Sequence, residues 1–184
     1  IEYWQKQLKS REAEKIEKEK GYTFVEDSGR GYRRVVASPN PNEIAELNAV
    51  NCLVENGFIV VTVGGGGIPV IKDENGNLTG TAAVIDKDLA SERLGEDMDA
   101  DILLILTAVE NVYINYGKPD QLRLDTLSVE QARKYMNEGH FAPGSMKPKI
   151  EAACRFAASK KGRRAIITSL DKAVYALSGN AGTV

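Results

Sequence analysis

Two features of the sequence have the residue types that phosphate chemistry requires. A run of four glycines, residues 64–67, follows an apolar segment. Each glycine loses more backbone freedom on folding than any other residue, so four in a row are unfavourable for a simple turn. They are useful where backbone N–H groups must approach an anion closely. Further along, Asp86, Lys87 and Asp88 form a compact cluster of alternating charge beside apolar residues. Together these features predict an α/β enzyme that handles phosphate.

Other phosphate and nucleophile motifs are absent from the sequence. Gly117 and Lys118 are followed by Pro119, which excludes the G-x-x-x-x-G-K-[ST] loop, and the glycine run leads into Pro69 instead of completing G-x-G-x-x-G. A nucleophilic triad lacks support, because the chain has one histidine and no G-x-S-x-G. A site of glycine backbone and lysines remains. Phosphoryl transfer needs such groups, because its transition state requires positioning and charge neutralisation.

Three short apolar runs predict buried strands, at residues 58–63, 102–106 and 164–168. Helical patterns separate them, so we expect a mostly parallel sheet covered by helices on both faces. Ligands of such sheets bind at the carboxyl ends of the strands. The segments expected at that edge are residues 64–67, 107–115 and 168–169.

The remaining elements are predicted from caps, breakers and hydrophobic periodicity. We expect two domains: a charged helix with a β-hairpin at residues 1–36, which could project as a subdomain, and a nucleotide-binding α/β domain at residues 37–184. The predicted helices cover residues 5–20, a segment from Pro41 capped by Asn40, residues 86–98, a segment from Ser128 to Gly139, a segment from Pro148 to Gly162 and a last helix capped by Ser169. Predicted hairpins cover residues 22–36 and 68–80.

Composition limits the classes of protein that fit. The 184 residues are 42% hydrophobic, which is enough for a core, and the net charge of −2 gives no basic field for nucleic acid. No apolar run reaches membrane-spanning length and no signal peptide is visible, so we expect a cytoplasmic protein without a membrane partner. Cys52 and Cys154 are expected to be reduced core residues rather than a disulfide or metal site. His140 has no neighbouring ligand cluster, so no protein-held metal site is predicted.

Several long segments resemble the carbamate kinases, which are members of the amino-acid kinase superfamily. Their order and spacing agree with that family over roughly residues 21–184. A uridylate or glutamate kinase is a lesser alternative, disfavoured by the segments TAVENVYINYGKP and HFAPGSM. The matching segments are EDSGRGYRRVVASPNP, VTVGGGGIPVI, AAVIDKDLAS, LILTAVENVYINYGKP, HFAPGSMKPKIEAA and AIITSLDKAVYALSGNAGT.

The resemblance implies a three-layer αβα sandwich and reversible phosphoryl exchange, in which ATP and carbamate give ADP and carbamoyl phosphate. In the fermentative direction the reaction makes ATP at the end of arginine breakdown. By motif match, Lys87 contacts the transferring phosphate, Asp88 orients the lysines and Lys149 stabilises the nucleotide phosphates. The resemblance also implies a homodimer, and Mg²⁺ carried mainly by ATP. The residues implied to line the reaction centre or frame the nucleotide are Gly64, Gly65, Gly66, Gly67, Thr107, Val112, Tyr113 and Met146.

These assignments have structural alternatives. Lys87 could be an exposed helix residue, Lys149 a common residue at a helix start, and Tyr113 and Met146 core residues. The sequence also departs from the family, because a carbamate kinase subunit is longer and its opening strand, with a glycine–asparagine loop and a second glycine loop, has no counterpart here. Two hypotheses therefore stand: a carbamate kinase or its catalytic C-terminal portion, and a truncated, catalytically silent nucleotide-binding module.

Overall fold

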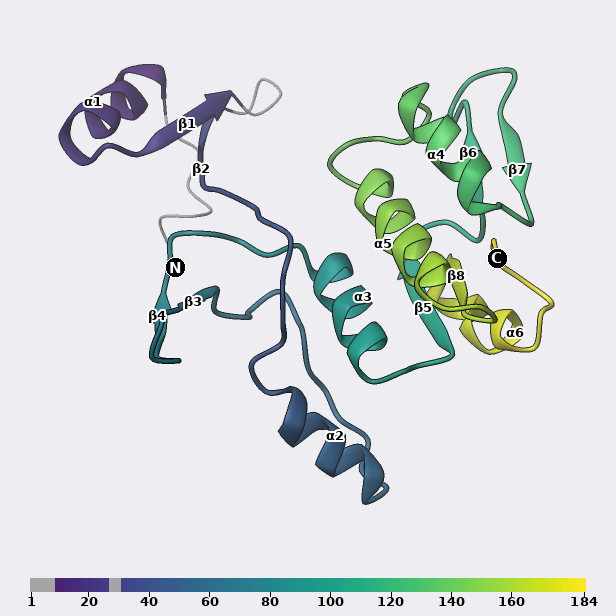
Figure 1. Cartoon of the computed structure of the whole chain (residues 1–184). Coiled ribbons are helices and arrows are strands. Elements are labelled where there is room, and N and C mark those ends of the chain that lie inside the picture. Colours follow the sequence, from purple (N-terminus) through teal and green to yellow (C-terminus); the bar gives the residue numbers. More distant parts are fainter. Residues whose placement is uncertain (1–8, 27–30) are drawn as a thin grey trace. The chain divides into compact units, whose positions relative to one another are not determined.

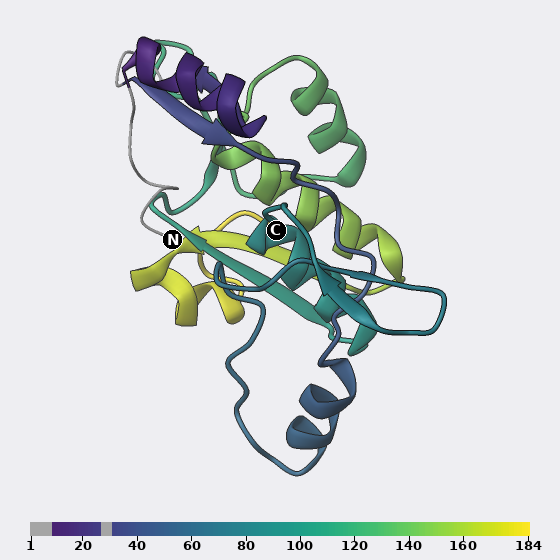
Figure 2. The same cartoon turned by 90° about the vertical axis from the view of Figure 1, so that its left-hand side faces the viewer.

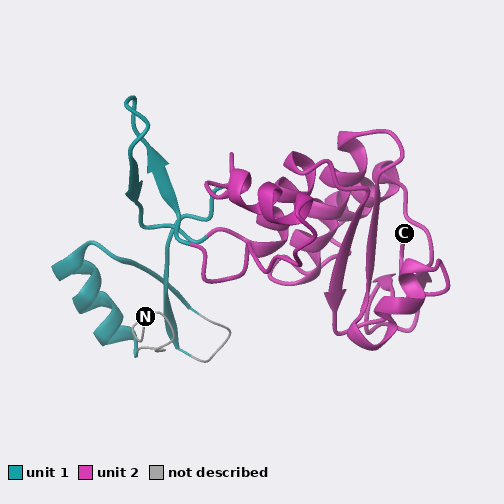
Figure 3. Ribbon diagram, turned by 90° about the horizontal axis from the view of Figure 1, so that it is seen from below, with its two compact units in different colours: residues 1–39, 68–84 teal, residues 40–67, 85–184 magenta. Residues whose placement is uncertain are grey.

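A computed structural model describes residues 9–26 and 31–184 of the chain. The chain divides into two compact units, which are coloured separately in Figure 3. The first contains residues 1–39 and 68–84, and the second contains residues 40–67 and 85–184. Residues 68–84, which the sequence analysis assigned to the nucleotide-binding domain, therefore belong to the same unit as the N-terminal residues.

In its described residues, the first unit consists of one helix and two antiparallel hairpins. Gly21 ends the helix in the left-handed conformation, with φ of 65°, as its position after the charged segment predicts. The predicted hairpins are confirmed, and Gly76 turns the second with φ of 84°. The predicted helix residues 5–8 and the turn that includes Arg30 lie outside the described residues. The elements are α1 (Ser10–Lys20), β1 (Thr23–Glu26), β2 (Tyr32–Val35), β3 (Val70–Lys72) and β4 (Leu78–Gly80).

The second unit is built on two parallel strands, β5 (Ile102–Thr107) and β8 (Arg164–Ser169), which pair from Ile102 with Arg164 to Thr107 with Ser169. Helices α3 (Lys87–Asp97) and α5 (Met146–Ser159) pack together and against this pair. Helix α6 (Ala173–Leu177) contacts β8 from the opposite side to α5 (Figure 2). The strand pair therefore carries helices on both faces, as a buried parallel ladder requires.

Among the remaining elements of this unit, helix α4 (Val129–Asn137) packs against α5 (Figure 1). The predicted capping box is present at the start of α4, where Ser128 Oγ accepts from Gln131 N at 3.2 Å and Gln131 Oε1 accepts from Ser128 N at 3.2 Å. The connection after β5 contains an antiparallel strand pair that the sequence analysis did not predict. These elements are α2 (Leu47–Glu55), β6 (Val112–Ile114), β7 (Leu122–Leu124), α4 (Val129–Asn137) and a 3₁₀ turn, η2 (Leu170–Lys172).

The prediction of a buried strand at residues 58–63 is wrong. The segment is extended but pairs with no strand in the described part of the chain, and Ile59 and Val61 are each 98% exposed. An extended segment is stable as a strand only when a neighbour pairs with its N–H and C=O groups. The apolar composition of residues 58–63 is typical of a buried strand, but no strand in the described part of the chain pairs with them.

Several helix boundaries and burial predictions also differ from the sequence analysis. Cys52, expected to be a core residue, is exposed, whereas Cys154 is buried. Helix α2 begins at Leu47 rather than at Pro41, and along it Val50 is buried while Val54 is 43% exposed. Helix α5 begins two residues before Pro148, and Ser169 precedes the 3₁₀ turn without a side-chain cap. Strand β5 is partly rather than fully buried. In the described part of the chain, every helix is too short or too polar to cross a bilayer.

Candidate functional site

A cavity of about 280 Å³ lies in the second unit, beside residues 103–106 of strand β5. Its walls come from the segment before the glycine run, the first turns of α3 and α5, and β5. It brings together Lys87, Asp88 and Lys149, which the sequence analysis selected as catalytic. The lining residues are Thr62, Val63, Gly64, Lys87, Asp88, Ser91, Leu103, Leu104, Ile105, Leu106 and Lys149.

A largely buried ion pair joins α3 to α5 at this cavity. Lys149 Nζ lies 2.9 Å from Asp88 Oδ2 and 3.2 Å from Oδ1, and the two side chains are 13% and 10% exposed. Removing one partner of such a pair leaves an uncompensated charge away from water. The pair therefore fixes both side chains and aligns the two helix starts.

Lys87 adds a second, more mobile ammonium group. Its Nζ lies 3.9 Å from Asp88 Oδ2, and its side chain is 60% exposed. Two ammonium groups thus share one carboxylate, which leaves an excess positive charge facing the cavity. Such an arrangement attracts phosphate, for which lysine acts as a point charge.

The first turn of α3 is held by Asp86, whose Oδ1 accepts from Asp88 N at 2.8 Å and from Leu89 N at 3.3 Å. This is an N-cap, and it uses N–H groups that an anion could otherwise bind. Positive charge at the start of α3 therefore comes from Lys87 rather than from these amides. Asp86 fixes the direction in which Lys87 and Asp88 leave the helix.

Of the glycine run, Gly64 lines the cavity. Gly67 N donates to Gly64 O at 3.2 Å, so the run forms a turn. A Cβ at Gly64, Gly65 or Gly66 would meet no atom within 4 Å, so packing of the protein does not require glycine there. Val63, just before the run, has φ of 48°, which is strained for a β-branched residue. Strain of this kind gathers at ligand-binding sites.

The residues expected to frame a nucleotide do not line this cavity. Thr107 ends β5, and Tyr113 stands on β6 with its ring centroid 5.8 Å from that of Tyr116. Val112 is fully buried in the main core, and Met146 is partly buried against the same core. Their roles toward a nucleotide stay predictions.

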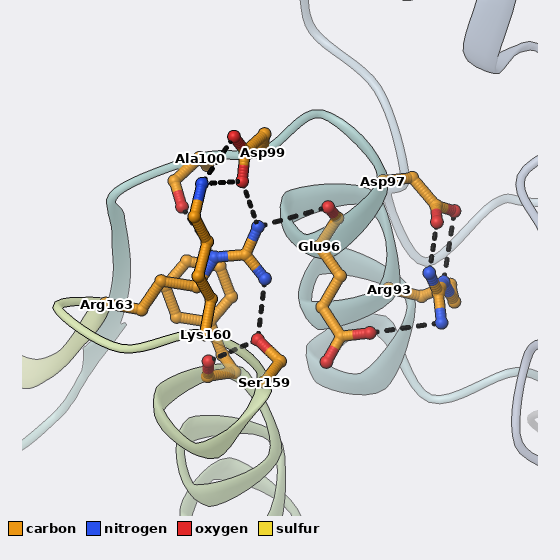
Figure 4. Close-up of polar contacts among 9 residues, drawn as sticks. Arg93, Glu96, Asp97, Asp99, Ala100, Ser159, Lys160 and Arg163 are labelled. Atoms are coloured by element: carbon orange, nitrogen blue, oxygen red, sulfur yellow. Dashed lines mark hydrogen bonds and ion pairs between the residues drawn. The ribbon is translucent and has the colours of Figure 1, made fainter.

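The far end of α3 is anchored by Arg163, whose side chain is 7% exposed (Figure 4). Its guanidinium donates to the carbonyls of Glu96 at 3.2 Å and Ala100 at 3.1 Å, and to Asp99 Oδ1 at 2.8 Å. The last carbonyls of a helix lack N–H partners within the helix, and Arg163 donates to one of them, the carbonyl of Glu96 in the last turn of α3. The position of α3, and with it that of Lys87, is thus set at both ends.

Glu92, one turn after Asp88, is 5% exposed. Burial, together with a hydrogen bond to Glu96 and that residue's charge, raises the pKa of its carboxyl to about 7. The positive charges of Arg155 and Arg93 act in the opposite direction. A carboxyl with this pKa changes its charge near neutral pH.

Four contributors to the site were missed from the sequence: Thr62, Val63, Ser91 and the capping role of Asp86. Ser91 follows Lys87 by four residues, so helical spacing could have placed it on the same face. Its Oγ donates to the Lys87 carbonyl at 2.8 Å. No pattern in the sequence signals the positive φ of Val63.

Comparison with known proteins adds an independent line of argument. The family model described as "Amino acid kinase family" matches residues 5–169. The chain is 56% identical over 172 residues to a carbamate kinase of Clostridium perfringens, covering 94% of this chain and 54% of that protein. It is 58% identical over 173 residues to the carbamate kinase-like protein YqeA of Escherichia coli, covering 94% and 55%.

Solved structures show the same similarity. A carbamate kinase from Giardia lamblia bound to AMP-PNP matches with a TM-score of 0.86 and 42% identity, covering 97% of this chain and 56% of the other. This similarity confirms the α/β fold of the amino-acid kinases that the sequence predicts. The chain spans about half the length of the relatives it matches. In the described part of this chain, the parallel sheet consists of the strands β5 and β8.

Proposed function

The chain belongs to the amino acid kinase family, and we propose that it carries the nucleotide-phosphate site of a carbamate kinase. The proposed reaction is reversible phosphoryl transfer between ATP and carbamate, giving ADP and carbamoyl phosphate. The relatives named carbamate kinase support this activity, and the nucleotide analogue in the Giardia lamblia structure supports the nucleotide as a substrate.

One observation carries the proposal. Lys87 begins α3, and Lys149 lies in the first turn of α5, 61 residues after Asp88. Their ammonium groups nevertheless meet at the Asp88 carboxylate, beside the glycine loop. Neither the hydrophobic core nor the surface requires two lysines at this place. A site for the terminal phosphates of a nucleotide requires them.

In this proposal Lys149 has a fixed role and Lys87 a mobile one. Lys149, held by Asp88, neutralises charge on the nucleotide phosphates, and exposed Lys87 follows the phosphoryl group as charge develops on it. The glycine run lets main-chain N–H groups approach the same oxygens without a Cβ between them. Thr107, Tyr113 and Met146 would frame the nucleotide, with Val112 supporting β6 from the core.

The described residues contain no group of three or more His, Cys, Asp and Glu side chains that could hold a metal ion. We propose an Mg²⁺ ion that is bound mainly by the nucleotide, since Mg²⁺ usually takes few protein ligands together with substrate phosphates. Bound there, Mg²⁺ would neutralise part of the phosphate charge. Asp88 is engaged by Lys149 and is not assigned as its ligand.

The proposal is tested by mixing the purified 184-residue chain with ADP and carbamoyl phosphate and measuring ATP. We expect ATP formation that is lost in Lys87→Ala. Equal activity in that variant would refute the assignment of Lys87. No ATP from the parent chain, with saturable ADP binding, would favour the second candidate below.

The second candidate is a catalytically silent nucleotide-binding module. It is favoured by the unpaired segment 58–63, which leads directly into the glycine loop and is exposed. A loop whose preceding segment is not held by a sheet is less well positioned for chemistry than for binding. A homodimer, a cytoplasmic location and a place in arginine breakdown remain predictions from the family resemblance.

A further inference from the structure

Residues 182–184, which we call the 182–184 segment, are hydrogen-bonded on two sides within the second unit. On one side, Thr183 exchanges both backbone hydrogen bonds with Ile167 of β8, each at 2.9 Å. On the other, Val184 N donates to Asp125 O at 3.1 Å and Val184 O accepts from Leu127 N at 2.8 Å. The segment therefore lies between β8 and the chain that follows β7.

Side-chain bonds tie the same segment to the start of β6. Thr183 is 3% exposed, and its Oγ1 accepts from Val112 N at 2.8 Å and donates to the Leu124 carbonyl of β7. Asn111 is fully buried, and its Nδ2 donates to Gly182 O at 2.8 Å. One hydroxyl thus connects both strands of the β6–β7 pair to β8.

Gly182 makes this close approach possible. Its φ is +82°, and an added Cβ would lie 3.0 Å from both the Ile167 carbonyl oxygen and Thr168 Cβ. The first of these atoms belongs to the backbone of a buried strand, so it cannot move aside as a flexible side chain would. Any side chain at position 182 must displace the segment.

We propose that Gly182 and Thr183 are positioning residues for the nucleotide, acting through β6. Val112, whose amide Thr183 holds, is followed by Tyr113, which the proposed function places beside the nucleotide. The inference rests on that function for the ligand, while the connection between the segment and β6 stands on the hydrogen bonds alone. Without the Thr183 hydroxyl, the buried Val112 amide lacks its acceptor, and β6 loses its fixed distance from β8.

The experiment compares Thr183→Val, which keeps the shape and removes the hydroxyl, with Thr183→Ser, which keeps the hydroxyl. Hydrogen exchange of the Val112 amide and the Kd for ADP are measured on the whole 184-residue chain. We expect Thr183→Val to speed that exchange and to raise the Kd about tenfold, the effect of losing a buried hydrogen bond. Thr183→Ser should restore both values.

A pair of glycine variants provides a matched control. Gly182→Ala and Gly179→Ala both place a side chain at positive φ, but Gly179 has nothing within 4 Å of an added Cβ. We expect weaker ADP binding in Gly182→Ala alone. Parent-like exchange and ADP binding in Thr183→Val and Gly182→Ala would overturn the inference. Absence of ADP binding by the parent would instead overturn the proposed function and the nucleotide role with it, while Val112 exchange would still report the connection to β6.

Discussion

Asp88 has two lysine neighbours, and the two contacts differ in kind. Lys149 approaches both carboxylate oxygens and is 13% exposed, whereas Lys87 lies 3.9 Å away and is 60% exposed. Water screens an exposed pair far more than a buried one. The first contact is therefore structural, and the second leaves Lys87 able to move toward a ligand.

Substituting the two lysines should separate these roles. We expect Lys149→Met to lower the free energy of unfolding by about 3 kcal/mol, because it leaves the buried Asp88 carboxylate with only the exposed Lys87 nearby. Lys87→Met should change it by less than about 0.5 kcal/mol. Urea denaturation measures both, with Asp88→Asn combined with Lys149→Met as the control that should recover part of the loss. Equal effects of the two single variants would contradict the assignment.

Glu92 should make stability depend on pH in a defined direction. Its pKa is about 7 in the folded protein, against an ordinary value of 4.5, so the folded state binds the proton more strongly. Stability from this group is complete below about pH 4.5 and falls as pH rises through 7. We expect Glu92→Gln to be more stable than the parent by roughly 1–2 kcal/mol at pH 8 and equal to it at pH 4. A difference that is the same at both pH values would argue against this.

At the scale of elements, the exposure of segment 58–63 predicts that substitutions there change the free energy of unfolding little, although its apolar composition would predict a large change. Ile59 is 98% exposed, so Ile59→Ser should change the free energy of unfolding by less than about 0.5 kcal/mol. Ile105 of β5 is 6% exposed, and Ile105→Ala should cost about 2–5 kcal/mol. Thermal and urea unfolding of both variants check this. A loss above about 2 kcal/mol for Ile59→Ser would mean that the segment is packed as a strand after all.

Local signals in the sequence were sufficient where an element depends on its own residues. The Ser128 capping box, the Gly76 hairpin and the parallel strands β5 and β8 were predictable, because caps, turn residues and apolar runs act over short distances. Residues 58–63 were not predictable, because pairing depends on which other strands are present. The β6–β7 pair was missed because each strand has only three residues, which is too short for a clear alternating pattern.

The candidate site was predictable in its lysines and less so in its surroundings. Lys87, Asp88 and Lys149 were identified by motif, and the structure brings them together. The cap formed by Asp86 and the contact of Ser91 depend on where α3 begins, which the sequence placed only to within a few residues. The bonds of Thr183 to β6 join residues 71 apart, which no local pattern indicates.

At the scale of the whole molecule, the described units divide the chain into one that carries the lysine site and another built of a helix and hairpins. The chain spans about half the length of its relatives, so its own activity is a separate question from theirs. In the proposed function, the residues assigned to the nucleotide all lie in the second unit. Turnover requires in addition that carbamate or carbamoyl phosphate be held in line with it.

The most direct test of the central claim is isothermal titration of ADP into the parent chain, Lys87→Ala and Lys161→Ala. Lys161 is exposed beyond the opposite end of α5 from Lys149 and serves as the control. We predict saturable binding by the parent, affinity at least about tenfold weaker in Lys87→Ala through loss of a charged hydrogen bond, and no change in Lys161→Ala. Equal affinities of Lys87→Ala and the parent would contradict the claim that the cavity at Asp88 binds nucleotide phosphates.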